Sequence, residues 1–247
     1  MTGLLVSVRS AFEARLAYQG GADIIDIKEP HLGSLGAATS KVWCEVYDAL
    51  NHRVPVSVAL GEVWEDHVAR PTRPFAFAKI GLAGCQQRLG WQREWMLRMQ
   101  ELDPATDRVA VAYADWRLAN SPPPDDVLGF AVEAGCAALL VDTYQKSAGD
   151  LFSSLGYGTL QDLVLQARRQ RLMTVLAGSL RGNAYDAALA LQPDYVAVRG
   201  AACAAERTAQ IDGERVRQLK RRIAEMASPA ERPQVVAPIE NVSPRST

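Results

Sequence analysis

The stretch Gly20-Gly21-Ala22-Asp23-Ile24-Ile25-Asp26-Ile27-Lys28 contains, in order, the parts of a repeating structural unit. The glycine pair suits the end of a helix, because glycine readily adopts the conformation that ends one. The apolar run that follows suits a parallel strand, since such strands are buried on both faces. A charged residue then marks the end of the strand. Similar joints precede two later apolar runs, at 134–137 and 192–194.

Apolar runs of this kind recur along the whole chain, and segments with helical periodicity separate them. Trp95, Met99 and Leu102, for example, follow the i, i+4, i+7 spacing of a helix face. Alternating strands and helices predict a parallel sheet of the α/β class, and eight repeats favour its closure into a single-domain (β/α)8 TIM barrel. A doubly wound open sheet is the alternative, but no GxGxxG follows the first run. The predicted strands are Leu4–Val8, Ile24–Ile27, Val56–Leu60, Phe75–Ile80, Val109–Tyr113, Ala138–Val141, Met173–Ala177 and Tyr195–Val198.

The length of 247 residues is typical of one such barrel. We expect the catalytic barrel to occupy residues 1–227. Because residues 61–74 contain Pro71 and Pro74, at most a short helix is expected between the third and fourth strands. Residues 228–247 combine four prolines with Ser, Glu, Arg and Thr, which predicts a flexible, disordered tail with no part in the chemistry.

The composition is that of an ordinary globular protein, with 48% hydrophobic and 22% charged residues. A net charge of −1 argues against nucleic acid or an anionic membrane as a partner. No apolar run approaches the ~18 residues of a membrane span, and the first residues lack the features of a signal peptide. The four cysteines form no CxxC pair. We therefore expect a cytoplasmic protein with reduced thiols, and the sequence leaves a homo-oligomer open.

Several common chemistries lack their sequence signatures. The three histidines show no metal-ligand spacing, and there is no HExxH motif. No GxSxG elbow or Walker-type loop is present either. These chemistries are therefore poorly supported, and Schiff-base chemistry on a lysine, considered below, requires neither a metal nor an organic cofactor.

In a barrel the active site lies at the carboxyl ends of the strands, so polar residues that follow the apolar runs are the candidates. The chain has 22 arginines but only five lysines, and three of these lysines lie at or just after strand ends. Unlike arginine, lysine has an amine that can lose its proton and attack a carbonyl carbon. The three candidates are Lys28, Lys79 and Lys146.

Lys28 is the strongest of these, because strand alternation puts Asp26 and Lys28 on the same side. If that side is the lumen, the pair is either a Schiff-base lysine with an acid/base partner or a buried ion pair. Asp26 favours the protonated amine, so burial or a second cation such as Lys79 must lower the pKa of Lys28 for catalysis. Lys79, inside an apolar run, is interpreted as a general base or electrostatic partner, with a structural ion pair as the alternative.

Two further acidic residues follow later strands. Asp142 and Lys146 come after the sixth predicted strand and form either an acid/base pair or a brace of their loop. Asp115 follows the fifth, where capping of the next helix is the simplest interpretation.

The last two strand ends suggest an anion site. Gly178 and Ser179 follow the seventh run, and Arg199 and Gly200 follow the eighth. Small residues let backbone N–H groups approach a phosphate, and Arg199 would add forked donors. Tight turns with a surface arginine are the alternative. The predicted substrate-binding residues also include Ser7, at the end of the first run, and Ser34, in a glycine-containing loop (residues 30–37) that could form a lid.

These residues lie in motifs that resemble the (5-formylfuran-3-yl)methyl phosphate synthase family, also called 4-(hydroxymethyl)-2-furancarboxaldehyde-phosphate synthase. The resemblance spans roughly residues 4–225 and includes the stretch from Gly20 to Lys28. Two positions depart from the usual pattern: Glu29 stands where Asn is usual, and Leu32 where Glu is usual. The other matching motifs are Gly33-Ser34-Leu35-Gly36-Ala37, Lys79-Ile80-Gly81-Leu82, Val141-Asp142-Thr143-Tyr144-x-Lys146, Leu176-Ala177-Gly178-Ser179-Leu180 and Val198-Arg199-Gly200-Ala201-Ala202-Cys203.

The resemblance implies a TIM-barrel lyase that condenses two molecules of glyceraldehyde 3-phosphate, releases phosphate and water, and builds the furan of methanofuran-type cofactors. Lys28 would be its Schiff-base lysine and Lys79 its proton acceptor. Asp26, Asp142 and Lys146 would complete the acid/base set. The arginine-rich composition and the proline-rich end suggest a bacterial member that serves one-carbon metabolism.

Two alternatives remain beside this interpretation. Another class I aldolase-like barrel would share Lys28 and the anion loops but make no furan. A non-catalytic barrel that binds a sugar phosphate would tolerate Lys28→Arg, since binding alone needs no neutral amine. The three lysines at strand ends argue against this second alternative.

Overall fold

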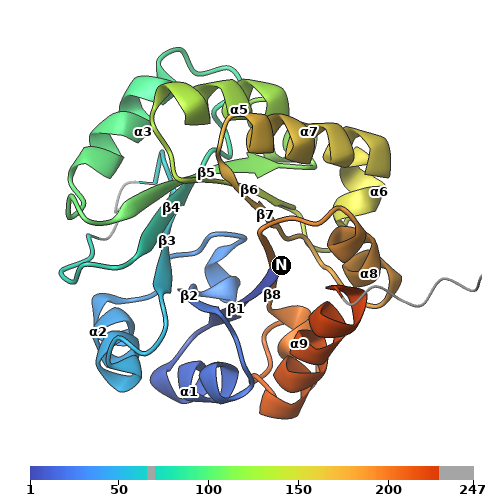
Figure 1. Cartoon of the computed structure of the whole chain (residues 1–247). Helices are drawn as coiled ribbons and strands as arrows, with labels where there is room; N and C mark the ends of the chain where they lie inside the picture. Colours follow the sequence, from blue (N-terminus) through green and yellow to red (C-terminus); the bar gives the residue numbers. More distant parts are fainter. Residues whose placement is uncertain (66–69, 228–247) are drawn as a thin grey trace, which may run out of the picture.

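The computed structural model describes residues 1–65 and 70–227. Eight parallel strands pair in chain order, and the last pairs with the first to close a barrel. The predicted TIM barrel is therefore confirmed (Figure 1). The strands are β1 (Gly3–Val8), β2 (Ile24–Ile27), β3 (Val56–Glu62), β4 (Phe77–Gly81), β5 (Asp107–Tyr113), β6 (Ala138–Asp142), β7 (Met173–Leu176) and β8 (Tyr195–Val198).

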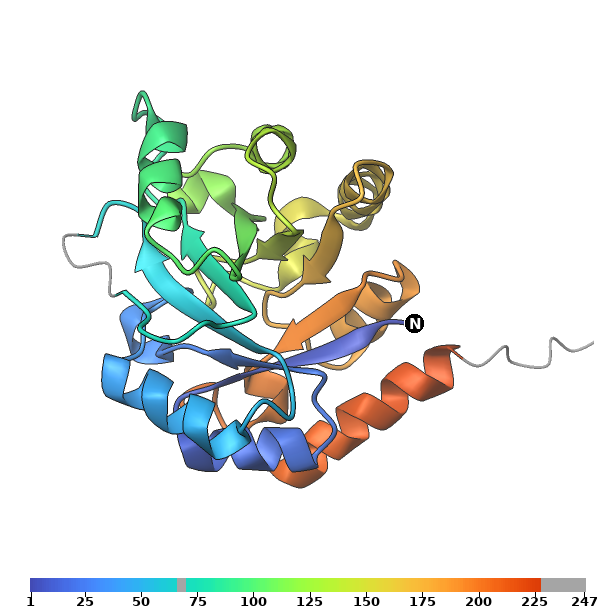
Figure 2. The ribbon, with the colours of Figure 1, turned by 60° about the vertical axis from the view of Figure 1, so that its left-hand side comes forward.

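The helices form a ring outside the strands (Figures 1 and 2). Helix α1 begins at the cap Ser10, whose hydroxyl accepts from the Glu13 backbone N–H, and ends at Gly20. A Cβ on Gly20 would lie 2.6 Å from Val216 Cβ, so glycine allows α1 to pack closely against α9. The helices are α1 (Ala11–Gln19), η1 (Pro30–Leu32), α2 (Ser40–Leu50), α3 (Trp91–Gln100), α4 (Trp116–Ala119), α5 (Pro124–Glu133), α6 (Leu151–Leu155), α7 (Tyr157–Arg169), α8 (Asn183–Ala190), η2 (Gly200–Ala202) and α9 (Gly213–Ala227).

Side chains alternate along each strand between two apolar layers. In β1, Leu4 and Val6 join the large core between strands and helices, whereas Leu5 joins a smaller core inside the barrel. In β2, Ile25 and Ile27 likewise face the helices. The residues between these two and just after them therefore face the lumen, and this alternation places the polar groups of the site.

The connection between β3 and β4 differs from the other crossovers. Among the residues described there, 63–65 and 70–76, none is helical, in agreement with the effect expected of its prolines. Strand β4 begins at Phe77, two residues later than predicted, because Phe75 packs outside the sheet against Trp43, with ring centroids 6.5 Å apart.

Two other sequence predictions concern the membrane and the tail. No helix in the described ranges is long and apolar enough to cross a membrane. The predicted flexible tail, residues 228–247, lies outside the described residues.

Candidate active site

A cavity of about 340 Å³ opens at the carboxyl ends of the strands. It is lined by every predicted site residue except Ser34. Its floor is apolar, with Leu5, Leu140 and Ala197 from the lumen core. The predicted residues that line it are Ser7, Asp26, Lys28, Lys79, Asp142, Lys146, Gly178, Ser179, Arg199 and Gly200.

Lys28 follows β2 directly, and its backbone N–H donates to the Val8 carbonyl at 3.0 Å. The residue is only 8% exposed, and among the described residues its amine has no hydrogen bond or ion pair. Burial lowers the pKa of this amine to about 8, although the carboxylates of Asp142 and Asp26 act in the opposite direction. Desolvation, together with the nearby cations of Lys146 and Lys79, therefore outweighs the neighbouring carboxylates, and about a tenth of the amine is neutral at pH 7.

Asp26 and Lys79 form a buried ion pair whose charges act on Lys28. Lys79 also donates to Ser57 Oγ at 2.9 Å, and Ser7 Oγ donates to Asp26 Oδ2 at 3.0 Å. Burial alone would raise the pKa of Asp26, but Lys79 and Lys28 outweigh it, so this pKa lies below its ordinary value. Asp26 is therefore ionised and holds Lys79 at the edge of the cavity.

Asp142 and Lys146 form a second pair, with 2.5 Å between Lys146 Nζ and Asp142 Oδ1. Burial favours the neutral forms of both groups. The pKa of Asp142 is nevertheless lowered, because Lys146 and Lys28 lie nearby, and burial lowers the pKa of Lys146. The Ser34 hydroxyl shares its proton between the Thr143 carbonyl at 2.9 Å and Asp142 Oδ2 at 3.2 Å. Ser34 thus contacts the Asp142–Lys146 ion pair instead of lining the cavity.

The loops after β7 and β8 bring backbone close to the cavity. Gly178 has a φ of 104°, and a Cβ there would lie 2.9 Å from Thr143 Cγ2. At Gly200 a Cβ would lie 2.4 Å from the guanidinium of Arg181. Glycine is therefore required at Gly178, whereas at Gly200 the flexible Arg181 side chain could move aside. Ser179, in the loop after β7, is exposed.

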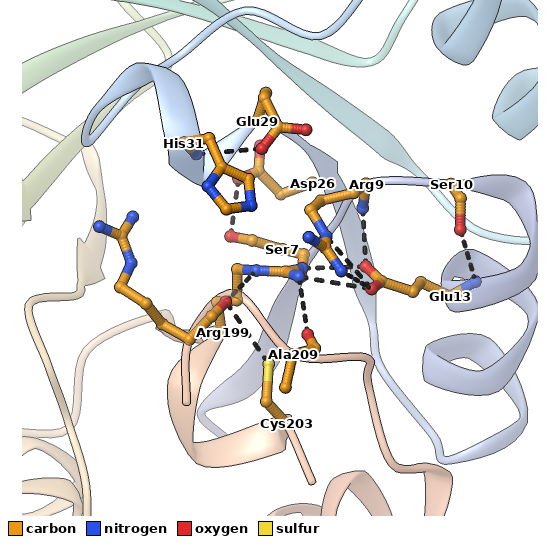
Figure 3. Close-up of polar contacts among 11 residues, drawn as sticks. Ser7, Arg9, Ser10, Glu13, Asp26, Glu29, His31, Arg199, Cys203 and Ala209 are labelled. Atoms are coloured by element: carbon orange, nitrogen blue, oxygen red, sulfur yellow. Dashed lines mark hydrogen bonds and ion pairs between the residues drawn. The ribbon is translucent and has the colours of Figure 1, made fainter. Parts of the chain in front are cut away.

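The structure places Arg199 at the cavity, as predicted, but its side chain is not available to a phosphate. It borders the cavity and is only 5% exposed, so it is not a surface arginine. Its guanidinium points away to Glu13 and to backbone carbonyls, as Figure 3 shows. Forked donors for a phosphate are thus not free on this side chain. Sequence reasoning missed the partner, because Glu13 lies 186 residues away.

Asp115 also differs from its predicted role, because its side chain does not cap α4. Its carboxylate accepts from the backbone N–H groups of Tyr144 and Gln145, at 2.7 and 2.8 Å. It therefore shapes the loop that carries Lys146.

Two arginines at the cavity were not predicted, Arg181 and Arg207. Both lie in the loops after β7 and β8, which sequence reasoning had assigned to anion binding. They were missed because the chain has 22 arginines, and the sequence does not show which of these face the cavity. Within residues 1–65 and 70–227, no group of three His, Cys, Asp or Glu residues is placed to hold a metal ion.

Solved structures of similar fold include thiamine phosphate pyrophosphorylase from Pyrococcus furiosus, with a TM-score of 0.60 and 13% identity. It is matched over 92% of this chain and 97% of its own. KGPDC from Streptococcus mutans has a TM-score of 0.59 and 13% identity, over 92% of this chain and 100% of its own. At this identity the likeness supports the barrel fold alone.

Sequence comparison identifies nearer relatives. A protein named (5-formylfuran-3-yl)methyl phosphate synthase from Methanosarcina acetivorans is 32% identical over 226 residues, 87% of this chain and 97% of its own. One of the same name from Methanopyrus kandleri is 36% identical over 210 residues, 81% of this chain and 89% of its own. The model of the 4-HFC-P synthase family matches residues 4–220. The chain therefore belongs to the 4-HFC-P synthase family.

Proposed function

We propose that this protein is a (5-formylfuran-3-yl)methyl phosphate synthase of methanofuran-type cofactor biosynthesis. It condenses two molecules of glyceraldehyde 3-phosphate, with loss of one phosphate and two waters, through a Schiff base on Lys28. The observation that carries this proposal is the buried Lys28 amine in the cavity that two carboxylate–lysine pairs also line, with a pKa of about 8. No cofactor is needed for this chemistry, which we place in the cytoplasm.

The first step is attack of the neutral Lys28 amine on the aldehyde carbon of one triose phosphate. Water leaves, and an iminium forms that draws electrons from the neighbouring carbon. An amine hydrogen-bonded to a carboxylate would be a poorer nucleophile, because its lone pair would be protonated. Among the described residues the amine of Lys28, unlike those of Lys79 and Lys146, has no carboxylate partner within ion-pair distance.

Proton transfers fall to the two flanking pairs. Lys79 would pass its own proton to its partner Asp26 and then accept the proton from the carbon next to the iminium. Phosphate then leaves from the following carbon, which breaks a carbon–oxygen bond and makes the enzyme a carbon–oxygen lyase. Loss of phosphate leaves an enol conjugated with the iminium. The terminal carbon of this enol attacks the second carbon of the other triose phosphate, after proton transfer has moved the carbonyl group of that molecule from its first to its second carbon. Asp142 and Lys146 would supply the proton transfers of cyclisation and dehydration.

The phosphate ends of the substrates would lie against the loops after β7 and β8. Gly178, Ser179 and Gly200 expose backbone there, and backbone N–H groups are effective phosphate donors when no side chain intervenes.

Borohydride trapping tests the covalent step. The protein is incubated with glyceraldehyde 3-phosphate, reduced, digested and mapped by peptide mass spectrometry. We expect a triose-derived adduct on Lys28, and none at this position in Lys28→Arg. Lys41→Arg is the matched control, because Lys41 is an exposed lysine on α2 that pairs with Glu45. No adduct on Lys28, under conditions that trap a known aldolase, would contradict the mechanism.

Product analysis separates the synthase from another aldolase-like barrel. We expect an ultraviolet-absorbing furan aldehyde with the mass of two triose phosphates less one phosphate and two waters. Free phosphate should accumulate at one equivalent per furan. An adduct on Lys28 without this product would support the aldolase alternative.

A further inference from the structure

Arg199 uses all of its hydrogen-bond donors within the protein. A guanidinium has five N–H donors. Nε donates to the Arg207 carbonyl at 2.6 Å, and the terminal nitrogens reach the carbonyls of Ser7 at 2.9 Å and Ala209 at 3.1 Å. The two remaining bonds, at 2.9 and 3.4 Å, go to the carboxylate of Glu13. Arg199 is therefore fully satisfied without a ligand (Figure 3).

Two of the acceptors of Arg199 belong to one loop, residues 203–211, which follows β8 and η2. Cys203 and Ile211 form an antiparallel bridge at its base. Cys203 Sγ also contacts the Arg207 carbonyl at 3.7 Å. The buried Arg199 guanidinium thus fixes the middle of this loop through the backbone carbonyls of Arg207 and Ala209.

Arg207 has a charge without a matching partner. Its side chain is half-buried, lines the cavity together with Lys28, and donates to the Gly33 carbonyl at 3.4 Å. Among the described residues no carboxylate lies within ion-pair distance of it, and Glu206, also at the cavity, is exposed. Burial lowers the pKa of Arg207, which shows that its cation is partly desolvated. A partly desolvated, unpaired cation favours binding of an anion.

We propose that Arg207 binds the phosphate group of a substrate, and that Arg199 and Glu13 are positioning residues that hold the loop carrying Arg207. This inference rests on the proposed function for the identity of the phosphorylated substrate. The sequence predicts anion binding by Arg199, but this inference gives that role to Arg207, eight positions later, and Arg199 instead holds the loop.

The test compares a phosphorylated with an unphosphorylated aldehyde. Borohydride trapping on Lys28 is measured with glyceraldehyde 3-phosphate and with glyceraldehyde, in wild type and in Arg207→Gln. We expect roughly a 10- to 100-fold loss of trapping efficiency with the phosphate, the range of one charge-assisted hydrogen-bonded pair, and little change with glyceraldehyde. Arg215→Gln is the control, because Arg215 is an exposed arginine on α9. Equal losses with both aldehydes, or no loss with either, would overturn the proposal.

A direct binding measurement keeps this inference separate from the proposed function. Titration calorimetry with inorganic phosphate should show binding to wild type that Arg207→Gln abolishes or weakens about tenfold or more. Such a result would hold even if no adduct or furan formed, in which case only the proposed function fails. Phosphate binding unchanged in Arg207→Gln would overturn the inference whatever the activity.

The positioning role of Arg199 is tested by Arg199→Lys, which keeps the charge but loses the fork. We expect it to weaken phosphate binding, and the double variant Arg199→Lys/Arg207→Gln to bind no more weakly than Arg207→Gln alone. Additive losses would show that Arg199 acts on the anion independently. Because this comparison uses binding by each folded variant, checked by circular dichroism, a general loss of stability would not imitate it.

Discussion

At the scale of the residue, the chemistry depends on how one amine differs from its neighbours. Lys79 and Lys146 each contact a carboxylate, whereas Lys28 forms no ion pair among the described residues, although the charges of both pairs act on its pKa. Charges of both signs surround it, and their effects on its pKa oppose one another. Burial therefore decides the outcome, and it favours the neutral, nucleophilic form.

The pH dependence of trapping follows from this. The rate of Lys28 adduct formation should rise about tenfold per pH unit up to about 8 and then level off, because the neutral amine is the attacking form. Quenching with borohydride at short times, from about pH 6 to about pH 9, measures this rate. A rate that does not change with pH would contradict the assignment.

A matched variant sharpens this prediction. Asp142 is the strongest influence that raises the pKa of Lys28, so Asp142→Asn should move the midpoint to lower pH. It should also free Lys146 from its carboxylate, and a nearby cation acts in the same direction. A midpoint that moves to higher pH would show that Asp142 does not stabilise the protonated amine.

At the scale of the element, the loop after β2 crosses the mouth of the barrel and joins strands that are distant in sequence. The Gly61 N–H donates to the Leu35 carbonyl at 2.9 Å, and Ser34 reaches Asp142 at the end of β6. Leu35 is 1% exposed and packs into the lumen core. The predicted lid is, in this structure, packed over the site and fixed from several sides.

Gly36 makes this path possible. A Cβ there would lie 2.3 Å from the Glu29 carbonyl oxygen and 2.6 Å from Leu32 Cβ, so Gly36→Ala must displace the loop. Ser34 would then move away from Asp142. We expect kcat/KM to fall roughly 10- to 100-fold, since small displacements of positioning groups have effects of this size. Overpacking should also lower the free energy of unfolding by about 1–3 kcal/mol.

The control is Gly129→Ala in α5, where a Cβ would meet nothing within 4 Å. Alanine there should leave kcat/KM unchanged and raise stability slightly, by about 0.5–1 kcal/mol. Steady-state kinetics and urea unfolding measure both variants. Full activity in Gly36→Ala would show that the position of the loop does not matter for catalysis.

At the scale of the whole molecule, the barrel closes where the last strand meets the first. Strands β8 and β1 pair from Gly3 with Tyr195 onward. Beyond the last pair, Arg199 joins the end of β8 to the Ser7 carbonyl in β1 and to Glu13 in α1. This buried ion pair therefore connects the last strand of the barrel to the first strand and its helix.

Removing one charge of this pair should be strongly destabilising, because the other charge would stay buried. We expect Glu13→Gln to lower the free energy of unfolding by about 3–5 kcal/mol at neutral pH, measured by urea unfolding. Glu225→Gln, in an exposed pair with Arg222, should change it by less than about 1 kcal/mol. Similar effects of the two substitutions would mean that the closure does not depend on Glu13.

The pH dependence of this difference follows from the pKa of Glu13. Burial opposes ionisation, but Arg199 and Arg9 outweigh it, so the pKa lies below the ordinary value of 4.5. A carboxyl group with a lowered pKa in the folded state stabilises the protein fully above its ordinary pKa. The difference between wild type and Glu13→Gln should therefore be constant above about pH 5 and shrink as the pH falls further.

The sequence by itself determined the eight strands, their parallel closure and the placement of Asp26 and Lys28 on one side of their strand. These features depend on local periodicity, because a few consecutive residues are enough to show a buried strand and the alternation of its side chains between two sides. For the same reason the amino-acid sequence was enough to place the three strand-end lysines at one mouth of the barrel.

Only the tertiary structure decided which partner each long side chain takes. Glu13 and Arg199 are 186 residues apart, and Ser34 and Asp142 are 108 residues apart, so no local pattern links them. The pKa of Lys28 likewise depends on its burial and on charges from several strands. A flexible charged side chain selects its partner by proximity, and the closure of the barrel creates that proximity.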